Sequence, residues 1–173
     1  MSKTRSIATS ILVCMICVWG LQACKGGYSF TGTSISPEAK TVSIAYIENM
    51  APIVYPSLSN TLTEALKDKF TRNTRLSLVT EDGDLQFEGE ITNYDVTSMA
   101  VQANEIASTN RLTVTVKIRY INNIDTKQSY DKSFSQYEDF DSSQTLDSAQ
   151  EQLVTQIIEK LIEDIFNNAV ANW

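Results

Sequence analysis

The sequence predicts an α+β fold, a two-layer sandwich in which two helices cover one face of a mostly antiparallel sheet of four to five strands. The expected order of elements is β-α-β-β-β-β-α. Several segments alternate apolar and polar residues, which is typical of strands with one solvated face. Two other segments repeat apolar residues at helical spacing, and turn-forming residues separate the segments. A sheet with one apolar face needs such helices to cover it.

The first residues are typical of a secretory signal. Lys3 and Arg5 form a basic start, and the apolar run that follows, residues 7–19, is shorter than the ~20 residues of a transmembrane helix. Residues 21–24 read Leu-Gln-Ala-Cys, which is the lipobox of bacterial lipoproteins. We therefore expect residues 1–23 to be removed and Cys24 to carry diacylglycerol and a further acyl chain, because two or three chains anchor stably. The alternative is a plain secreted protein cut before the same cysteine.

The rest of the chain has the size and composition of one domain. Cleavage leaves 150 residues (173 less 23), with residues 24–37 as a lipidated N-terminus and Gly/Ser/Thr-rich tether and residues 38–173 as a single α+β domain. Histidine is absent and Cys24 is the only remaining cysteine, which excludes Ser-His-Asp and Cys-His sites, an ordinary zinc site and an internal disulfide. Twelve basic against 21 acidic residues leave a net charge of −9, which argues against non-specific nucleic-acid binding.

The first half of the domain contains a strand, a helix and two further strands. Residues 41–48 alternate, with Val42, Ile44 and Tyr46 expected on one face. Two prolines end this strand, and residues 58–71 form an amphipathic helix. The next predicted elements are a strand at residues 76–79, a tight hairpin turn at residues 81–84 and an alternating strand at residues 85–92.

The second half contains a hairpin and a long helix. Residues 97–110 are a long loop or strand ends that extend into solvent, residues 111–121 are the clearest strand, and a turn leads to a partner strand at residues 127–137. In the last helix, residues 146–171, apolar pairs recur every four positions, so the stripe drifts by about 40° at each step.

The drift of this stripe supports two hypotheses. In the first, the early half of the helix is core, and the late half reaches the sheet edge, the first helix or a partner through Phe166, Val170 and Trp173. In the second, the helix crosses the sheet obliquely and buries every pair in the monomer.

Two acidic groups are candidates for chemistry. Glu88 and Glu90 share one face of a strand and could perform acid–base work or bind a cation, although an ordinary solvated face is the favoured interpretation. Residues 81–84 resemble a fragment of a calcium loop but lack its remaining ligands, which favours the turn. No metal site and no cofactor site are predicted.

Basic residues are the third candidate. Lys117 and Arg119 share the polar face of the clearest strand, with Lys127 and Lys132 expected across the hairpin. Such a cluster would bind phosphate or carboxylate groups. The alternative is a cross-strand mixture of opposite charges with Glu88, Glu90 and Asp131.

The lipobox, the order of elements and five segments resemble the LptE family of lipopolysaccharide-assembly lipoproteins, in its Bacteroidetes-type branch. The resemblance covers essentially the whole mature chain, and its specificity comes from the order and context of the segments. The segments are residues 28–32, 62–70, 84–91, 110–116 and 163–167.

The resemblance implies a non-enzymatic outer-membrane lipoprotein that faces the periplasm. Such a protein would plug the lumen of an LptD-type barrel, assist folding of the barrel and help deliver lipopolysaccharide to the outer leaflet. Its partners would be the barrel, lipopolysaccharide and the membrane that holds its anchor, and it would carry no cofactor besides the lipid on Cys24. Basic residues of proteobacterial members are proposed to touch lipopolysaccharide but are not matched here residue by residue, so Lys117 and Arg119 rest on strand geometry alone. The alternative is a lipoprotein adaptor of a secretion pore or another envelope complex, with an enzyme third.

Overall fold

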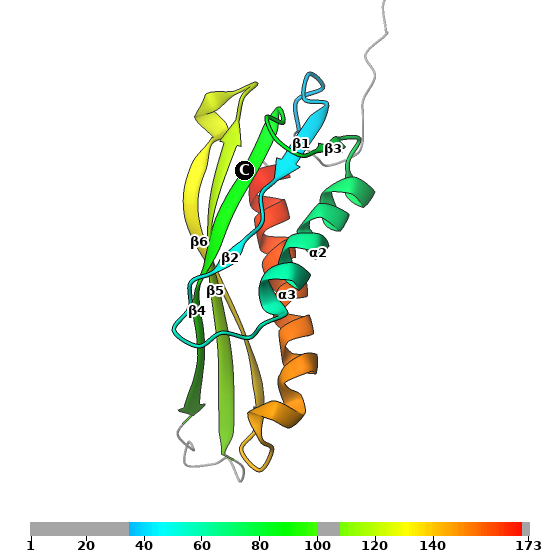
Figure 1. The fold of residues 1–173 in the computed structure, drawn as a ribbon. Coiled ribbons are helices and arrows are strands. Elements are labelled where there is room, and N and C mark those ends of the chain that lie inside the picture. Colours follow the sequence, from blue (N-terminus) through cyan, green and yellow to red (C-terminus); the bar gives the residue numbers. More distant parts are fainter. Residues whose placement is uncertain (1–34, 100–107, 171–173) are drawn as a thin grey trace, which may run out of the picture. The chain divides into compact units, whose positions relative to one another are not determined.

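Two helices cover one face of a mixed sheet, as Figure 1 shows. The structure is a computed structural model that describes residues 35–99 and 108–170. The sheet order is β3-β1-β4-β5-β6, and β2 continues along β4 beyond β1. The elements are β1 (Thr41–Ile44), β2 (Glu48–Asn49), α2 (Leu58–Asn73), β3 (Ser77–Val79), β4 (Leu85–Met99), β5 (Thr109–Asn122), the 3-10 turn η2 (Thr126–Gln128), β6 (Tyr130–Asp141) and α3 (Leu146–Val170).

The predicted α+β sandwich is confirmed, with a correction to strand direction and number. The long ladders β4–β5 and β5–β6 are antiparallel, whereas the short ladders of β1 with β3 and β4, and of β2 with β4, are parallel. The sheet therefore has six strands and is mixed. β4 and β5 are both longer than predicted, so the strand ends in the region of residues 97–110 do extend, and residues 100–107 lie outside the described part.

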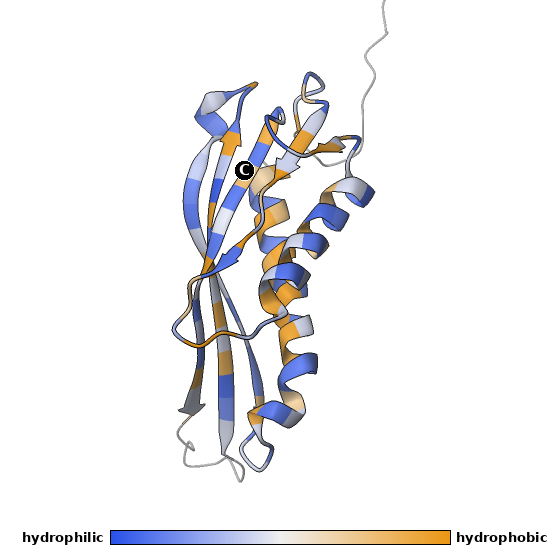
Figure 2. Ribbon diagram, viewed as in Figure 1, coloured by the Kyte–Doolittle hydropathy of each residue, from blue (hydrophilic) through white to orange (hydrophobic). Residues whose placement is uncertain are grey.

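The strand β5 forms the centre of the core because its alternation places every second side chain under the helices. Leu112, Val114, Val116, Ile118 and Tyr120 are buried. Figure 2 shows hydrophobic residues gathered where the two helices face each other and the sheet. Burial of such side chains stabilises a fold by about 1.5–3 kcal/mol each, so this row contributes much of the free energy of folding.

An extra residue separates β1 from β2. Ile44 pairs with Phe87 and Glu48 with Glu90, so four steps along one strand oppose three along the other. The side-chain alternation therefore shifts by one residue, and Ile47 is buried while Tyr46 is exposed. The expectation that Tyr46 lies on the buried face is wrong for this reason.

The connection between β3 and β4 is a crossover, and the predicted hairpin turn at residues 81–84 is wrong. β1 lies between β3 and β4 and runs parallel to both, so the chain must pass over β1 to begin β4. Gly83 crosses in close contact, since a Cβ there would lie 2.5 Å from the Ser43 nitrogen and 2.9 Å from the Val42 carbonyl carbon. The carboxylate of Asp84 then accepts hydrogen bonds from the Lys40 amide at 2.8 Å and from Thr41.

The apolar stripe of α3 is buried along its described length. Phe166 and Val170 are 7% and 3% exposed. The ring of Phe166 meets Phe70 of α2, with the ring centres 5.1 Å apart. The drifting stripe thus turns from the sheet toward α2, because two helices share one sheet face. The late half reaches the first helix, and the prediction that Phe166 and Val170 face a partner is wrong. Trp173 lies outside the described residues.

None of the helices described here is long and apolar enough to cross a bilayer.

Candidate functional site on the open sheet face

The face of β4, β5 and β6 opposite the helices is not covered by any described element, and we call it the open face. Alternate residues of the three strands project there, and the ladder registers align them in rows across the sheet. Charged residues form two groups on this face, one in the neighbouring rows of Arg119 and Lys117 and the other around Arg111, and a row with hydroxyl groups lies between them. The hydroxyls of Thr115 and Ser135 are 3.0 Å apart in this middle row.

The first charged group occupies two neighbouring rows and contains both predicted cations. Arg119 lies between Glu88 and Asp131 in the ladder, and its guanidinium is 3.6 Å from the Glu88 carboxylate. The Lys117 ammonium is 3.4 Å from the carboxylate of Asp131. These residues, with Gly89 and Glu90, line an open hollow of about 320 Å³. The structure thus shows the cross-strand mixture of charges that was the alternative to an all-basic cluster.

The other two lysines of the predicted cluster lie elsewhere. Lys132 pairs with the buried Ile118, so it projects on the helix side of the sheet, where its ammonium is 5.1 Å from the centre of the Phe134 ring. Lys127 belongs to the turn η2. In β6, which begins at Tyr130, the odd-numbered side chains project on the open face. Lys132 is even-numbered, and its side chain therefore projects on the helix side.

The ion pairs of this first group are loose. All four side chains are about half exposed, and both N–O distances exceed the ~2.8 Å of a strong charge-assisted hydrogen bond. Exposed pairs of this kind contribute only about 0–1 kcal/mol. Lys117 and Arg119 can therefore exchange these carboxylates for a phosphate or another carboxylate at little cost.

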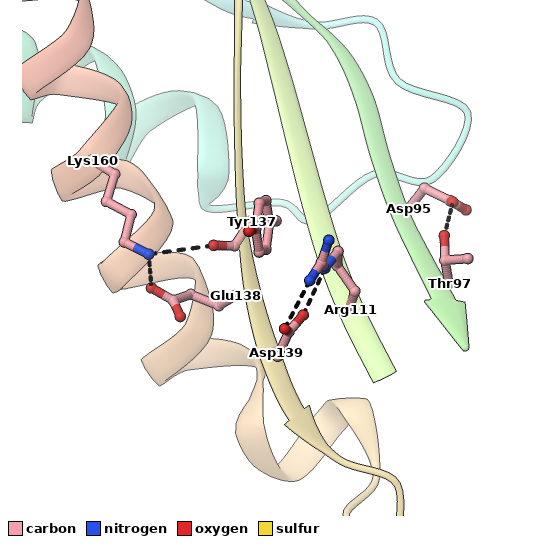
Figure 3. Close-up of polar contacts among 7 residues, drawn as sticks. All are labelled: Asp95, Thr97, Arg111, Tyr137, Glu138, Asp139 and Lys160. Carbon is pink, nitrogen blue, oxygen red and sulfur yellow. Dashed lines mark hydrogen bonds and ion pairs between the residues drawn. The ribbon is translucent and has the colours of Figure 1, made fainter. Parts of the chain in front are cut away.

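The second charged group, near the far end of the same face, is tightly paired (Figure 3). Arg111 donates two hydrogen bonds to the two carboxylate oxygens of Asp139, at 2.7 and 2.9 Å. Its guanidinium also stacks on Tyr137, 3.7 Å from the ring centre. The bond to Arg111 lowers the pKa of Asp139, and the bond to Asp139 raises the pKa of Arg111. Arg111 is thus held in one position, unlike the two cations of the first group.

Sequence reasoning missed the Arg111–Asp139 pair. The strand that contains Arg111 was recognised, but its partner strand was predicted to end at residue 137, before Asp139. The pairing could have been found only from the register of the hairpin, which places the two residues directly opposite each other.

The two acidic candidates form no metal site within residues 35–99 and 108–170, where no group of three metal-binding side chains is found. Glu88 and Glu90 project together, as predicted, but face Arg119 and Lys117 across the ladder. The carboxylate of Asp84 accepts hydrogen bonds at the start of β1, and these bonds from the Lys40 amide and Thr41 lower its pKa. Cations opposite Glu88 and Glu90, and the hydrogen bonds of Asp84, therefore account for both acidic candidates. Cys24 lies outside the described residues.

Comparisons with known proteins identify the fold and the family. A family model described as LptE, lipopolysaccharide-assembly, matches residues 39–169. No curated protein sequence matches the chain.

Several solved structures share the fold. The hypothetical protein CT253 from Chlamydia trachomatis is 9% identical, with a TM-score of 0.55 over 78% of this chain and 99% of that one. A homologue of a neuraminyllactose-binding hemagglutinin from Helicobacter pylori is 12% identical, with a TM-score of 0.50 over 81% and 88%. At these identities the likeness concerns the fold alone.

Proposed function

The chain belongs to the lipopolysaccharide-assembly family LptE, and from this membership we propose that it is a non-enzymatic partner of an LptD-type barrel in the outer membrane. The observation that carries the proposal is the family match, which spans every helix and strand of the described fold except the last residue of α3. In this role the chain plugs the barrel, assists its folding and takes part in the transport of lipopolysaccharide to the outer leaflet.

The proposed location follows from the N-terminus. Lipid chains on Cys24 hold the protein at the periplasmic side of the outer membrane, and the Gly/Ser/Thr-rich residues that follow link the anchor to the domain. The lipobox supports this part of the proposal, as does membership of a lipopolysaccharide-assembly family.

We assign the contact with lipopolysaccharide or with the barrel to Lys117 and Arg119. Both project from the central strand β5 into the open hollow, and their present carboxylate partners are loosely bound. Phosphate groups bind strongly to Arg and Lys when charge-assisted hydrogen bonds replace weaker ones. Arg111 is a poor candidate because its donors already serve Asp139.

Complementation of a strain depleted of the chain tests this assignment. The double variant Lys117→Gln, Arg119→Gln should lower the amount of lipopolysaccharide that reaches the cell surface, measured by surface labelling. The matched control is Arg72→Gln, which removes an exposed charge from α2, where Arg72 pairs with Asp68. The assignment fails if the double variant and the control both restore normal surface labelling at equal protein levels.

The alternative is an adaptor of a secretion pore or another envelope complex. It differs in the partner rather than in the fold, so the protein that co-purifies with the chain separates the two: an LptD-type barrel supports the proposal, and a secretion pore supports the alternative.

A further inference from the structure

Within residues 35–99 and 108–170, the second half of β4 has no strand paired with it on the side away from β5. β2 pairs with Glu90 and Ile91, and the last main-chain bond on this side runs from the Met50 amide to the Ile91 carbonyl, at 2.9 Å. β4 continues to Met99 with β5 on its other side. Among the described residues, no strand lies beside residues 93–99 on the outer side. This part of β4 is called the open edge below.

The backbone groups of the open edge can be assigned to individual residues. The carbonyls of Phe87 and Ile91 accept hydrogen bonds from the β1–β2 side of β4. Up to Ile91, the main-chain amides and carbonyls of odd-numbered residues therefore point away from β5, which we call outward. The register shift between Ile91 and Asn93 adds one residue to β4 and reverses the alternation. The outward amides and carbonyls of the open edge are therefore those of Tyr94, Val96 and Ser98.

An apolar loop lies where the open edge begins. Figure 1 shows the segment between β2 and α2 leaving the sheet beside β4. Met50, Ile53 and Val54 in this loop are 55–63% exposed. The loop is fixed in place, since Ala51 is buried and the Tyr55 ring stacks on Tyr94 with their centres 6.3 Å apart. A preformed apolar surface thus adjoins main-chain groups that pair with no strand in the described part of the chain.

The other edge of the sheet is protected in a way that the open edge is not. β6 carries five charged residues, and two of its side chains are tied to α3, Glu138 to Lys160 at 2.6 Å and Gln136 to Asp164 at 2.5 Å. Charged residues and covering contacts are the usual devices that prevent edge pairing. The open edge has one charged residue, Asp95. The contrast indicates that the open edge is available for pairing.

We propose that the open edge and the apolar loop bind an extended segment of the partner protein, which adds to the sheet as a strand beside β4. Main-chain hydrogen bonds to Tyr94, Val96 and Ser98 hold the segment, and an aliphatic side chain of the segment packs on Ile53 and Val54. The inference rests on the proposed partnership with a barrel and specifies one of its contacts.

The short length of the open edge favours a partner segment over a second copy of this chain. Two copies paired through seven residues would bury well under the roughly 1,600 Å² of a typical stable interface. A segment of a protein that is already bound nearby needs little affinity of its own, because tethering gives it an effective concentration of about mM.

Photo-cross-linking in the purified complex of the full lipidated chain with its barrel tests the inference. Benzophenone side chains are placed singly at Asp95, at Thr97 and at Val54, and Thr71 on α2 serves as the control position. We expect adducts from Asp95, Thr97 and Val54 to one contiguous barrel segment, and none from Thr71. The adduct site should shift by two residues between Asp95 and Thr97.

A pair of variants tests the main-chain bond itself. Ser98→Pro removes an outward amide, whereas Ser98→Ala keeps it, and both lose the side-chain bond to Asn110. We expect the yield of adducts from Val54 to fall about five-fold in Ser98→Pro, the equivalent of one hydrogen bond of ~1 kcal/mol, and to stay unchanged in Ser98→Ala.

The outcomes separate this inference from the proposed function. A barrel that co-purifies but forms no adducts with Asp95, Thr97 and Val54 overturns the inference and leaves the proposed function standing. Adducts between two copies of the chain, or with residues 24–34 of the same chain, also overturn the inference. A preparation without any barrel overturns both.

Discussion

Gly83→Ala is predicted to destabilise the domain strongly, because the crossover between β3 and β4 has no room for a methyl group. The added Cβ would lie 2.5, 2.8 and 2.9 Å from three backbone atoms, those of Ser43, Leu85 and Val42 respectively. Backbone atoms of neighbouring strands cannot rotate away as a side chain can. The crossover must therefore lift off β1.

The magnitude follows from the contacts that such a movement breaks. Overpacking costs typically about 1–3 kcal/mol. Lifting the crossover also weakens the bonds of Gly83 with the Ser43 hydroxyl, at 3.2 Å, and with the Asn123 side chain, at 2.9 Å. At about 0.5–1.5 kcal/mol for each bond, the total loss of unfolding free energy is about 2–6 kcal/mol.

Urea denaturation of the non-lipidated mature chain, followed by circular dichroism, measures this loss. The matched control is Asp82→Gly in the same crossover, where the backbone has a φ of 52° that glycine adopts readily. We expect the control to change the unfolding free energy by no more than about 0.5 kcal/mol. A loss below about 1 kcal/mol for Gly83→Ala would refute the close passage over β1.

Three further predictions concern the core, the acid response and the anchor. Ile157→Ala should lower the unfolding free energy by about 2–5 kcal/mol, because Ile157 is fully buried at the centre of α3. The control Thr155→Ala, at an exposed position of the same helix, should change the unfolding free energy little. Equal effects of the two variants would contradict the packing described. The pKa of Asp84 is lower in the folded chain than in the unfolded one, so its stabilising effect is complete above about pH 4 and disappears as the pH falls through the folded pKa. Asp84→Asn should therefore be less stable than wild type at pH 7, and the difference should shrink toward pH 2 in acid titrations of stability; a constant difference would argue against the assigned role. Cys24→Ala should abolish metabolic labelling with an alkynyl fatty acid and release the protein from the membrane, and labelling equal to wild type would disprove the lipobox assignment.

Periodicity along the chain was sufficient to predict the elements that form the core. The alternation of β5 and the paired apolar residues of α3 are properties of single segments, and both are confirmed. The shared face of Lys117 and Arg119 was predictable for the same reason. Which carboxylates pair with these two cations could not be predicted, because the pairing depends on the registers of β4–β5 and β5–β6.

The features that sequence reasoning missed depend on contacts between distant segments. The crossover at Gly83 exists only because β1 inserts between β3 and β4. One extra residue between β1 and β2 reverses the faces of Tyr46 and Ile47. The burial of Phe166 depends on α2, which lies far away in the sequence. No local pattern encodes these arrangements.

The most direct test of the account is the identity and amount of the protein that co-purifies with the full-length chain from detergent-solubilised outer membranes. An affinity tag placed after Trp173 avoids the lipid anchor, and a strain with the untagged chain is the control. The account predicts an LptD-type barrel in an amount comparable to the chain, identified by mass spectrometry. Recovery of the chain with a secretion pore instead, or with no barrel above the untagged control, would contradict it.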